Sequence, residues 1–404
     1  MKSNYLPIKR IYLKRFRSIP QATIDLKNPL FLVGKNGAGK SNLLKAFDFI
    51  SECMTQPLSA VLEKQGGLNA IRYRSEPRSR PGNFAVRVDF DFQNGNPAEG
   101  YYAFEIKAKA GYEFEVLEEK CVVRNKQNDR FYFHREKITV KTNIPGIDPA
   151  VDPQSLLLPL IGGNPQLVPV TKGLSGMKIF SIQPQVILEL QEPDSGLSLR
   201  SDGGNLASVL KALINDPDSK NRLFELLKSV VPGTDSVRPK KHGKMLSLEF
   251  HQKWDDQVSR SVRTVAHEAF SMSDGTLRAL GILLAFMQKN RPILIGLEEP
   301  EATIHPEALS CLLELIRGFS KETQILVTTH SPELLDAKWI EPENLRIVSW
   351  DKGITQVRPL GEAAKTSLRD HLMGAGELLR SNALQAVDNF FDDNDSTQLD
   401  LFND

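Results

Sequence analysis

The sequence has few cysteines and no long apolar run. Its three cysteines, Cys53, Cys121 and Cys311, are widely separated, which favours buried thiols in a reducing cytoplasm over disulfides or a zinc site. No segment approaches the ~20 apolar residues of a membrane helix, and 1–14 lacks the apolar stretch of a signal peptide. The seven histidines show no metal-ligand clustering. We therefore expect a cytoplasmic globular protein.

Net charge is also nearly absent, but the charge is unevenly distributed. The formal net charge is +1, yet residues 388–404 include six aspartates and no lysine or arginine, a composition typical of disordered segments. Each of two basic clusters predicts either a surface that neutralises DNA phosphates or an ordinary solvated loop. The clusters are Arg72, Arg74, Arg78 and Arg80, and Arg238, Lys240, Lys241 and Lys244.

The most informative segment follows the apolar run Leu30–Val33. Residues 34–41 read Gly-Lys-Asn-Gly-Ala-Gly-Lys-Ser, the G-x-x-x-x-G-K-S pattern of a phosphate-binding loop, and 42–52 continue with helical spacing. In such a loop Lys40 reaches the β- and γ-phosphates and Ser41 holds Mg²⁺. The segment therefore predicts a site for ATP and Mg²⁺ at the N-terminus of a helix. The residues expected to hold the nucleotide are Gly34, Asn36, Gly37, Gly39, Lys40, Ser41 and Asn42.

Hydrophobic periodicity predicts an α/β fold around this loop. Segments that alternate with period two predict an antiparallel sheet beside the nucleotide site; they are 9–16, 22–26, 84–92, 101–109, 113–123 and 131–140. Residues 143–176 predict a loop, and 205–230 predict helices with a break near 216–218. Farther on, buried strands and helices alternate, which predicts a parallel sheet covered on both faces. These segments are helix 277–288, strand 293–297, helix 306–317 and strand 325–329.

Acidic and basic side chains follow the two buried strands of this second half. Glu298 and Glu299 come directly after 293–297, where a phosphate-loop enzyme holds Mg²⁺ and activates water. We assign Glu298 to the metal and Glu299 to the general base that deprotonates the attacking water. His330 follows 325–329, at the sheet edge where ligands bind, and we expect it to contact the γ-phosphate.

A further anion site is predicted ahead of these strands. Residues 271–278 read Ser-Met-Ser-Asp-Gly-Thr-Leu-Arg at the start of the apolar helix, and Ser and Gly at a helix N-terminus favour anion binding. A single nucleotide bound at the phosphate loop does not require this additional anion site. The economical explanation is a second protomer, in which Ser273 and Gly275 of one chain bind the γ-phosphate held by the other. An ordinary helix cap is the alternative.

In this order the motifs resemble those of ATP-binding-cassette (ABC) ATPases. The Walker A motif would be 34–41, the signature 273–276, the Walker B motif 293–299 and the switch histidine His330. The resemblance implies an α/β, ABC-type P-loop ATPase head with an antiparallel β subdomain and a short helical insertion.

Within that class the chain is similar to the soluble branch of RecF, SMC-type heads and overcoming-lysogenization-defect (OLD) ATPases. Residues 299–306 resemble that branch's E-P-E-x-x-x-H-P segment, and Arg15-Phe-Arg-Ser18 resembles its N-terminal strand motif. Residues 67–72 and 202–206 resemble stretches of small stand-alone ATPases near the OLD group. The resemblance spans about residues 5–380.

Three features depart from the ABC pattern. Glu298 stands where the Walker B motif usually has aspartate, which lengthens the metal-binding arm. The signature lacks Gly-Gly-Gln, as in other soluble members. The Q-loop glutamine would be Gln183 or Gln185.

The resemblance divides the chain into four parts. They are an ATPase lobe with Walker A and the β subdomain (1–190), a helical insertion (191–244), a second ATPase lobe with signature, Walker B and switch histidine (245–380), and an acidic flexible tail (381–404). We expect neither the Toprim nuclease of OLD enzymes nor an SMC-type coiled-coil arm, because about 70 residues follow His330 and no long heptad run occurs.

The tail ends in a short motif, Gln398-Leu399-Asp400-Leu401-Phe402. It resembles the Q-L-[SD]-L-F peptide by which bacterial proteins bind the sliding clamp of DNA polymerase. Leu401 and Phe402 would fill an apolar pocket of the clamp while Gln398 makes polar contacts. In the alternative interpretation, Leu399, Leu401 and Phe402 pack back on the body of the protein.

Together these features predict a cytoplasmic, nucleoid-associated ATP hydrolase that dimerises on ATP, acts on DNA and is recruited by the clamp. A role in repair, replication or phage defence, and a partner nuclease, follow from the resemblance alone. One alternative is a scaffold or regulator of a separate effector with little hydrolysis, which Glu298 keeps open. Another is a transporter ATPase subunit with a membrane partner, against which the clamp-like tail and the large β insertion argue.

Overall fold

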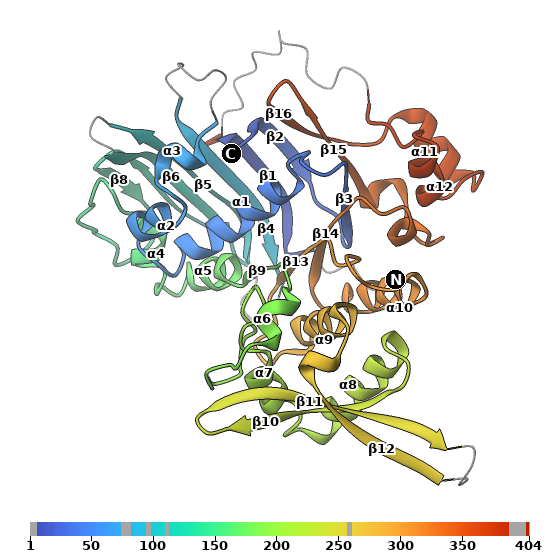
Figure 1. Cartoon of the computed structure of the whole chain (residues 1–404). Coiled ribbons are helices and arrows are strands. Elements are labelled where there is room, and N and C mark those ends of the chain that lie inside the picture. Colours follow the sequence, from blue (N-terminus) through green and yellow to red (C-terminus); the bar gives the residue numbers. More distant parts are fainter. Residues whose placement is uncertain are drawn as a thin grey trace.

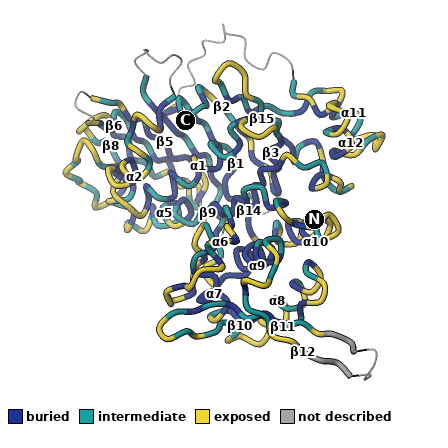
Figure 2. Tube along the Cα trace, viewed as in Figure 1, coloured by how far each residue is buried: buried dark blue, intermediate teal, exposed yellow. Residues whose placement is uncertain are grey.

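Three sheets and their covering helices make up the computed structural model (Figure 1), which describes residues 6–73, 82–93, 98–109, 113–256, 261–387 and 401–403. We call them the outer sheet, the central sheet and the small sheet. The outer and central sheets lie in the upper part of Figure 1, and the small sheet lies in the lower part. Buried residues concentrate where the central sheet meets its helices (Figure 2).

The outer sheet is antiparallel and, within the described residues, has seven strands in the order β2-β1-β4-β5-β6-β7-β8. The strands predicted from alternation are confirmed, except that 131–140 forms a hairpin of two strands. The hairpin turns at Lys137, which takes a φ of 52° without any glycine to signal the turn. The strands are β1 (Ile8–Phe16), β2 (Ile19–Asp25), β4 (Phe84–Phe92), β5 (Ala98–Ala108), β6 (Phe114–Arg124), β7 (Arg130–Glu136) and β8 (Thr139–Thr142).

The central sheet has the order β16-β15-β3-β14-β13-β9 in the described part of the chain, with parallel neighbours from β15 to β9 and an antiparallel edge at β16. The parallel strands predicted before Glu298 and His330 are confirmed. Because β3 lies beside β14, the phosphate loop and the ends of the later strands meet at one edge. The strands are β3 (Leu30–Val33), β9 (Met177–Phe180), β13 (Leu294–Glu298), β14 (Gln324–Thr329), β15 (Leu345–Asp351) and β16 (Ile354–Arg358).

Neighbouring residues of β3 enter two different cores. Leu30 and Leu32 face the core shared with the outer sheet, whereas Phe31 and Val33 face the core on the other side. A strand that is buried on both faces has no polar alternation, which explains why this segment is continuously apolar.

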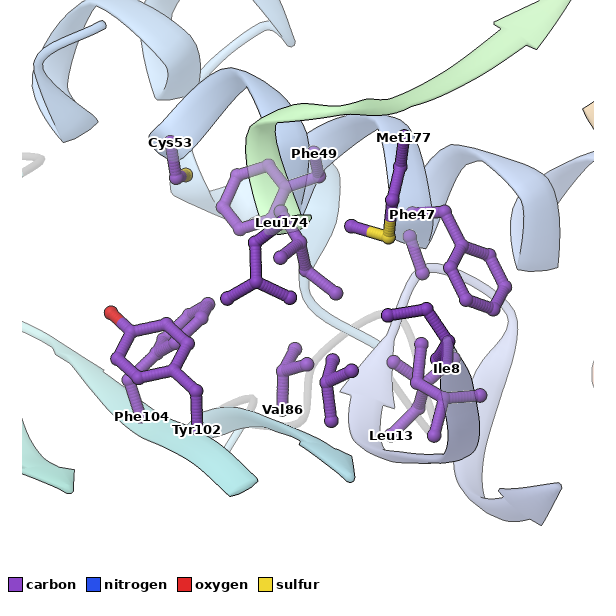
Figure 3. Close-up of a cluster of buried hydrophobic side chains, with 14 of the residues drawn as sticks. Ile8, Leu13, Phe47, Phe49, Cys53, Val86, Tyr102, Phe104, Leu174 and Met177 are labelled. Atoms are coloured by element: carbon purple, nitrogen blue, oxygen red, sulfur yellow. The ribbon is translucent and has the colours of Figure 1, made fainter. Parts of the chain in front are cut away.

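Helix α1 (Lys40–Cys53) packs between the central and outer sheets. Phe49 lies over Phe104 of the outer sheet, and Phe47 lies on the side of Ile8 and Leu13 (Figure 3). Burying each large apolar side chain stabilises the fold by roughly 1.5–3 kcal/mol. This packing fixes the direction in which the N-terminus of α1 presents the phosphate loop.

The segment 143–176 was predicted to be a loop, and that prediction is wrong. It contains α4 (Leu157–Ile161) and α5 (Val168–Ser175). The N–H groups of Leu157 and Leu158 donate to the buried carboxylate of Glu119 on β6, at 2.6 and 2.8 Å. A distant residue thus supplies the N-terminal acceptor, so the local sequence carried no capping signal.

The lower part of the molecule consists of α6–α9 and the small sheet, in the order β10-β11-β12. The predicted break within 205–230 is confirmed, because Asp216 caps a new helix by accepting from Ser219 N at 2.9 Å. The segment 191–244, expected to be helical, also contains strand β10. The elements are α6 (Pro184–Leu188), α7 (Leu206–Leu213), α8 (Pro217–Val230), β10 (Thr234–His242), β11 (Met245–Asp256), β12 (Ser261–Glu268) and α9 (Asp274–Met287).

The other helices cover the sheets or connect strands. The predicted helix at 306–317 is confirmed as α10, which packs against α8 and the second core. These elements are α2 (Leu58–Lys64), α3 (Leu68–Ile71), η2 (Ala269–Ser271), α10 (Pro306–Phe319), η3 (Glu333–Leu335), η4 (Pro342–Asn344), α11 (Glu362–Arg369) and α12 (Ala375–Arg380).

Candidate nucleotide site

The phosphate loop connects β3 to α1 at the edge of the central sheet. Gly37 and Gly39 adopt φ angles of 79° and 98°, a region that L side chains rarely enter. A Cβ at Gly39 would also lie 2.1 Å from Thr355 Oγ1, and one at Gly34 would lie 2.1 Å from Val348 O. The loop backbone therefore requires glycine at these positions, and it packs closely against β15 and β16.

Lys40, the first residue of α1, folds back over the loop. Its side chain is buried, and Nζ donates to Gly34 O at 2.8 Å and to Lys35 O at 3.1 Å. The same nitrogen lies 3.4 Å from Glu299 Oε1. The ammonium is thus held where it can reach both the loop and the end of β13.

Ser41 and Glu298 meet across the edge of the sheet. The hydroxyl of Ser41 donates to Oε1 of Glu298, and such oxygen donors suit Mg²⁺, which usually takes one or two protein ligands together with substrate phosphates. Within the described ranges, no group of three or more His, Cys, Asp or Glu side chains is arranged so that it could hold a metal ion by itself. The residues present therefore fit a magnesium ion shared with a nucleotide, and the longer arm of glutamate does reach Ser41.

Glu299 is held in a strained backbone conformation. Its φ is 41°, a region that costs of order 1–3 kcal/mol for a non-glycine residue. Its N–H donates to both O and Oγ1 of Thr328, at 3.2 and 3.1 Å. Its carboxylate lies 3.4 Å from Lys40 Nζ and 3.5 Å from His330 Nδ1. The arrangement brings the predicted base, the phosphate-loop lysine and the predicted switch histidine together.

Glu301 is a residue of this site that the sequence analysis did not single out. Its Oε1 accepts from Thr329 Oγ1 at 2.6 Å and from His330 N at 3.3 Å, and lies 3.8 Å from His330 Nδ1. Burial raises the pKa of this carboxyl, although the bond from Thr329 opposes the shift. The only signal in the sequence was its place in the E-P-E segment, so its contact with His330 emerged only in three dimensions.

A second missed feature is a chain of hydroxyl groups that anchors the loop. Asn42 Nδ2 donates to Ser18 Oγ at 2.7 Å, Ser18 Oγ lies 2.7 Å from Thr355 Oγ1, and Thr355 Oγ1 donates to Ala38 O at 3.0 Å. Thr355 belongs to the edge strand β16 and is fully buried. No local motif distinguishes it, because its role depends on the approach of β16 to the loop.

The signature-like segment begins α9. Ser273 caps the helix by accepting from Thr276 N at 3.2 Å, as the alternative interpretation expected. A Cβ at Gly275 would lie 2.4 Å from Thr303 O, so the segment packs tightly on the residues after Walker B. Between the described residues, no hydrogen bond links Ser273 or Gly275 to the phosphate loop of the same chain.

Arg278 and the candidate Q-loop glutamines lie near this segment. Arg278 Nη1 donates to Glu299 O at 3.4 Å, and burial lowers the pKa of its guanidinium. Gln185 Nε2 donates to Asp274 Oδ2 at 3.4 Å. Gln183 is the N-cap residue of α6. Of the two candidates, Gln185 contacts the signature helix.

The two basic clusters differ in their surroundings. Arg72 is buried and donates to Asn69 Oδ1 at 2.6 Å, whereas Arg74, Arg78 and Arg80 lie outside the described residues. In the second cluster, Lys240 lies 2.7 Å from Glu268 and 3.3 Å from Glu249. The other three members are exposed on or beside the β10–β11 hairpin; they are Arg238, Lys241 and Lys244.

The end of the chain lies on the outer sheet. Leu401 and Phe402 are buried against its strands, as the alternative interpretation of the tail expected for these two residues. The rest of the predicted clamp peptide, Gln398, Leu399 and Asp400, lies outside the described residues.

Comparison with known proteins places these motifs in a family. A family model described as "AAA domain, putative AbiEii toxin, Type IV TA system" matches residues 30–149 and 190–336. An OLD nuclease of Thermus scotoductus is 21% identical over 388 residues, which cover 91% of this chain and 68% of the relative. A DNA replication and repair protein RecF of Francisella tularensis subsp. novicida is 44% identical over 45 residues, 11% of this chain and 13% of that protein.

A solved structure supports the same fold. The crystal structure of an Smc head bound to the C-winged helix domain of ScpA matches with a TM-score of 0.52 and 16% identity. The match covers 89% of this chain and 99% of that head. No helix in the described part of the chain has the length and apolarity needed to span a bilayer.

Proposed function

The chain belongs to the family described as "AAA domain, putative AbiEii toxin, Type IV TA system" and has the fold of an ABC-type ATPase head of the RecF, SMC and OLD branch; on this premise we propose that it is a Mg²⁺-dependent ATP hydrolase that dimerises on ATP and acts on DNA. The observation that carries the proposal is the convergence of Lys40, Glu299 and His330 at one edge of the central sheet. A cation for the phosphates, a carboxylate base and an imidazole are the groups that phosphoryl transfer to water uses.

The phosphate loop and α1 bind the nucleotide in this proposal. The N–H groups of the loop face the phosphates, and Lys40 neutralises charge on the β- and γ-phosphates. Ser41 and Glu298 hold Mg²⁺, which spreads the charge that develops on the phosphates. The Ser41–Glu298 bond supports this assignment, because it shows that both oxygens reach one place.

Glu299 acts as the general base. Its carboxylate takes a proton from a water molecule as the water oxygen bonds to the γ-phosphorus and the bond to the oxygen of ADP breaks. His330 stabilises the charge on the γ-phosphate and releases it after hydrolysis. Glu301, which accepts a hydrogen bond from Thr329, positions His330 through contacts to its backbone and ring.

Two protomers complete two composite sites in the proposed cycle. Ser273 and Gly275 of one protomer contact the γ-phosphate bound by the other, and hydrolysis reopens the dimer. Ser273 is exposed at the start of α9, and Phe270, just before it, exposes 73% of its surface. An exposed polar N-terminus beside an exposed aromatic side chain is consistent with an interface.

DNA is the macromolecule on which we propose that the ATPase acts. The exposed cations of the β10–β11 hairpin, Arg238, Lys241 and Lys244, provide charge for phosphate contacts. The names of the relatives, a nuclease and a replication and repair protein, agree with action on DNA. Repair, replication-associated and phage-defence roles are all compatible with this chemistry, as is control of a separate nuclease.

The sliding clamp is the proposed recruiter. The motif 398–402 would enter the clamp pocket through Leu401 and Phe402, and the protein would then act at sites where the clamp is loaded. Both side chains are apolar, and an extended peptide can present such side chains to a pocket on a partner. Recruitment in this way places the protein in the cytoplasm, at the nucleoid.

The proposed functions follow the chain in order. Residues 1–190 bind nucleotide, 191–244 extend the head, 245–380 supply signature, Walker B and switch groups, and 381–404 connect to the partner. A scaffold that uses ATP only to dimerise is the second candidate, favoured by Glu298 in place of aspartate. A transporter subunit is the least favoured, because it leaves the 398–402 motif without a role.

Steady-state ATP turnover with and without duplex DNA, for the wild type and Glu299→Gln in parallel, tests the proposal. We expect DNA to stimulate turnover and the substitution to remove it. If DNA does not change the rate of ATP turnover, a protein would be the more suitable trigger. The basic clusters would then be ordinary solvent-exposed surface. Equal ATP turnover by the wild type and Glu299→Gln would favour the second candidate, a scaffold that uses ATP only to dimerise.

A further inference from the structure

The outer sheet has an apolar cluster of side chains on the face opposite to α1. Side chains alternate along its strands, so that Val86 and Phe104 face the core, whereas Ala85 and Ala103 face outward. Both alanines are nevertheless completely buried. Two small side chains on neighbouring strands leave room for a ligand, and aromatic and aliphatic side chains surround them. We call this surface the seat; it consists of Tyr12, Ala85, Tyr101, Ala103, Val122 and Tyr132.

The occupant of the seat is the end of the same chain. Leu401 and Phe402 join the cluster formed by the seat and retain only 5% and 9% of their exposure. Residues 401–403 thus lie on β4, β5 and β6, beside the mark for the C-terminus (Figure 1).

Polar groups of the seat bind the main chain of the occupant. Arg87 Nη1 donates to Leu401 O at 3.3 Å and to Asn403 O at 2.7 Å. Tyr101 OH donates to Phe402 O at 3.1 Å, and Lys120 Nζ donates to the same oxygen at 2.6 Å. Charged donors make these hydrogen bonds stronger than neutral ones. The seat therefore recognises a peptide backbone as well as two apolar side chains.

The principal donor, Arg87, also contacts side chains of the outer sheet itself. Arg87 Nε donates to Asp89 Oδ1 at 2.7 Å, and the guanidinium lies 3.8 Å from the ring centre of Tyr101 and 5.4 Å from that of Tyr12. A guanidinium fixed between two rings loses little freedom when it binds a ligand. This arrangement is typical of a recognition site rather than of a chance contact.

We propose that the seat is a reversible receptor for Leu401 and Phe402 of the same chain, and that an occupied seat withholds these side chains from a protein partner. One apolar side chain cannot be buried in two pockets, so seat binding and partner binding exclude each other. The second half of the proposal rests on the recruitment by the sliding clamp proposed above. Because only the unseated fraction of the chains binds the partner, the apparent affinity equals the intrinsic affinity multiplied by that fraction.

Hydroxyl-radical footprinting read by mass spectrometry tests the seat without any partner. We expect Phe402 to be oxidised several-fold more slowly in the whole protein than in a synthetic peptide of residues 388–404. Arg87→Ala should remove this protection. Lys107→Ala is the matched control, because Lys107 is an exposed cation on the same strand as Tyr101, and it should keep the protection.

A gentler variant guards against misfolding. Tyr101→Phe deletes one hydroxyl and should reduce the protection in part, while ATP turnover confirms that each variant is folded. If Phe402 is oxidised as fast in the wild type as in the peptide, the proposal that Phe402 occupies the seat is wrong. Protection that grows with protein concentration would show that a second copy provides the occupant, which contradicts binding within one chain.

Binding to a purified bacterial sliding clamp tests the competition. We expect the 388–404 peptide to bind about tenfold more tightly than the wild-type chain, and Arg87→Ala to recover the affinity of the peptide. A peptide that does not bind would end the recruitment proposal and leave the footprinting result intact. A protected Phe402 combined with equal affinities of chain and peptide would show that the seat does not compete.

Discussion

Lys40 Nζ lies 3.4 Å from Oε1 of Glu299, although one residue begins α1 and the other follows β13. The phosphate-binding cation and the proposed base are thus neighbours before any reaction. In the proposed reaction this carboxylate is the group that accepts a proton from water.

Lys40→Ala should abolish ATP binding. The loop would keep its backbone N–H groups but lose the charge that neutralises the β- and γ-phosphates. Titration with a fluorescent ATP analogue measures the effect. Lys45→Ala is the control, since Lys45 is an exposed lysine on the same helix, and it should bind normally. Tight binding by Lys40→Ala would refute the role assigned to the lysine.

Glu299→Gln should lower ATP turnover by a factor of about 10²–10⁴, the usual loss when a general base is removed. ATP binding should persist, because the amide leaves the loop and Lys40 in place. Turnover and nucleotide titration on the same preparation separate the two effects. Glu307→Gln, an exposed position on α10, is the control. A loss of binding that equals the loss of turnover would argue for a structural role.

Glu119→Ala should destabilise the protein by about 3–5 kcal/mol, the usual effect of breaking a buried ion pair. Arg135 lies 3.5 Å from Glu119, and both side chains are fully buried. The substitution also removes the acceptor for the N–H groups of Leu157 and Leu158. Urea unfolding measures the change, with the exposed Glu113→Ala as control. A change below 1 kcal/mol would contradict the argument.

Glu301→Gln should change stability in a manner that depends on pH. Burial raises the pKa of Glu301 above its value in the unfolded chain, so the ionised form carries a cost in the folded state only. That cost is absent below the unfolded pKa and fully present above the folded one. Relative to the wild type, the variant should therefore gain stability at about pH 8 and lose this advantage at about pH 4.

Thermal unfolding at both pH values checks this prediction. The amide oxygen can still accept from Thr329 and His330, so the comparison isolates the charge. A difference between the variant and the wild type that stays constant with pH would show that ionisation of Glu301 does not contribute.

The chemistry of the loop was predictable because its residues are contiguous. The proposed roles of Gly37, Gly39, Lys40 and Ser41 depend on backbone conformation and helix direction, which are set by neighbours in sequence. Glu298, Glu299 and His330 were predictable for a related reason. Each follows a buried strand, and parallel strands bring their carboxyl ends to one edge.

Other features could not be predicted, because their partners are distant in sequence. Helix α4 depends on Glu119 of β6 as the acceptor for its first N–H groups. Thr355 anchors the phosphate loop only because β16 passes beside it. Glu301 became part of the site through Thr329 and His330. Apart from the place of Glu301 in the E-P-E segment, none of these residues differs locally from an ordinary surface or strand residue.

By itself, the sequence determined the ligand class, the order of the motifs and the alternation of the strands, since each is a short-range property of the chain. Only the tertiary structure decided where the end of the chain lies. A Leu-Phe pair near an acidic segment is equally compatible with a partner pocket and with the protein's own surface. The outcome depended on Ala85 and Ala103, whose small side chains on adjacent strands pack with Leu401 and Phe402, and on Arg87, whose guanidinium lies over two rings.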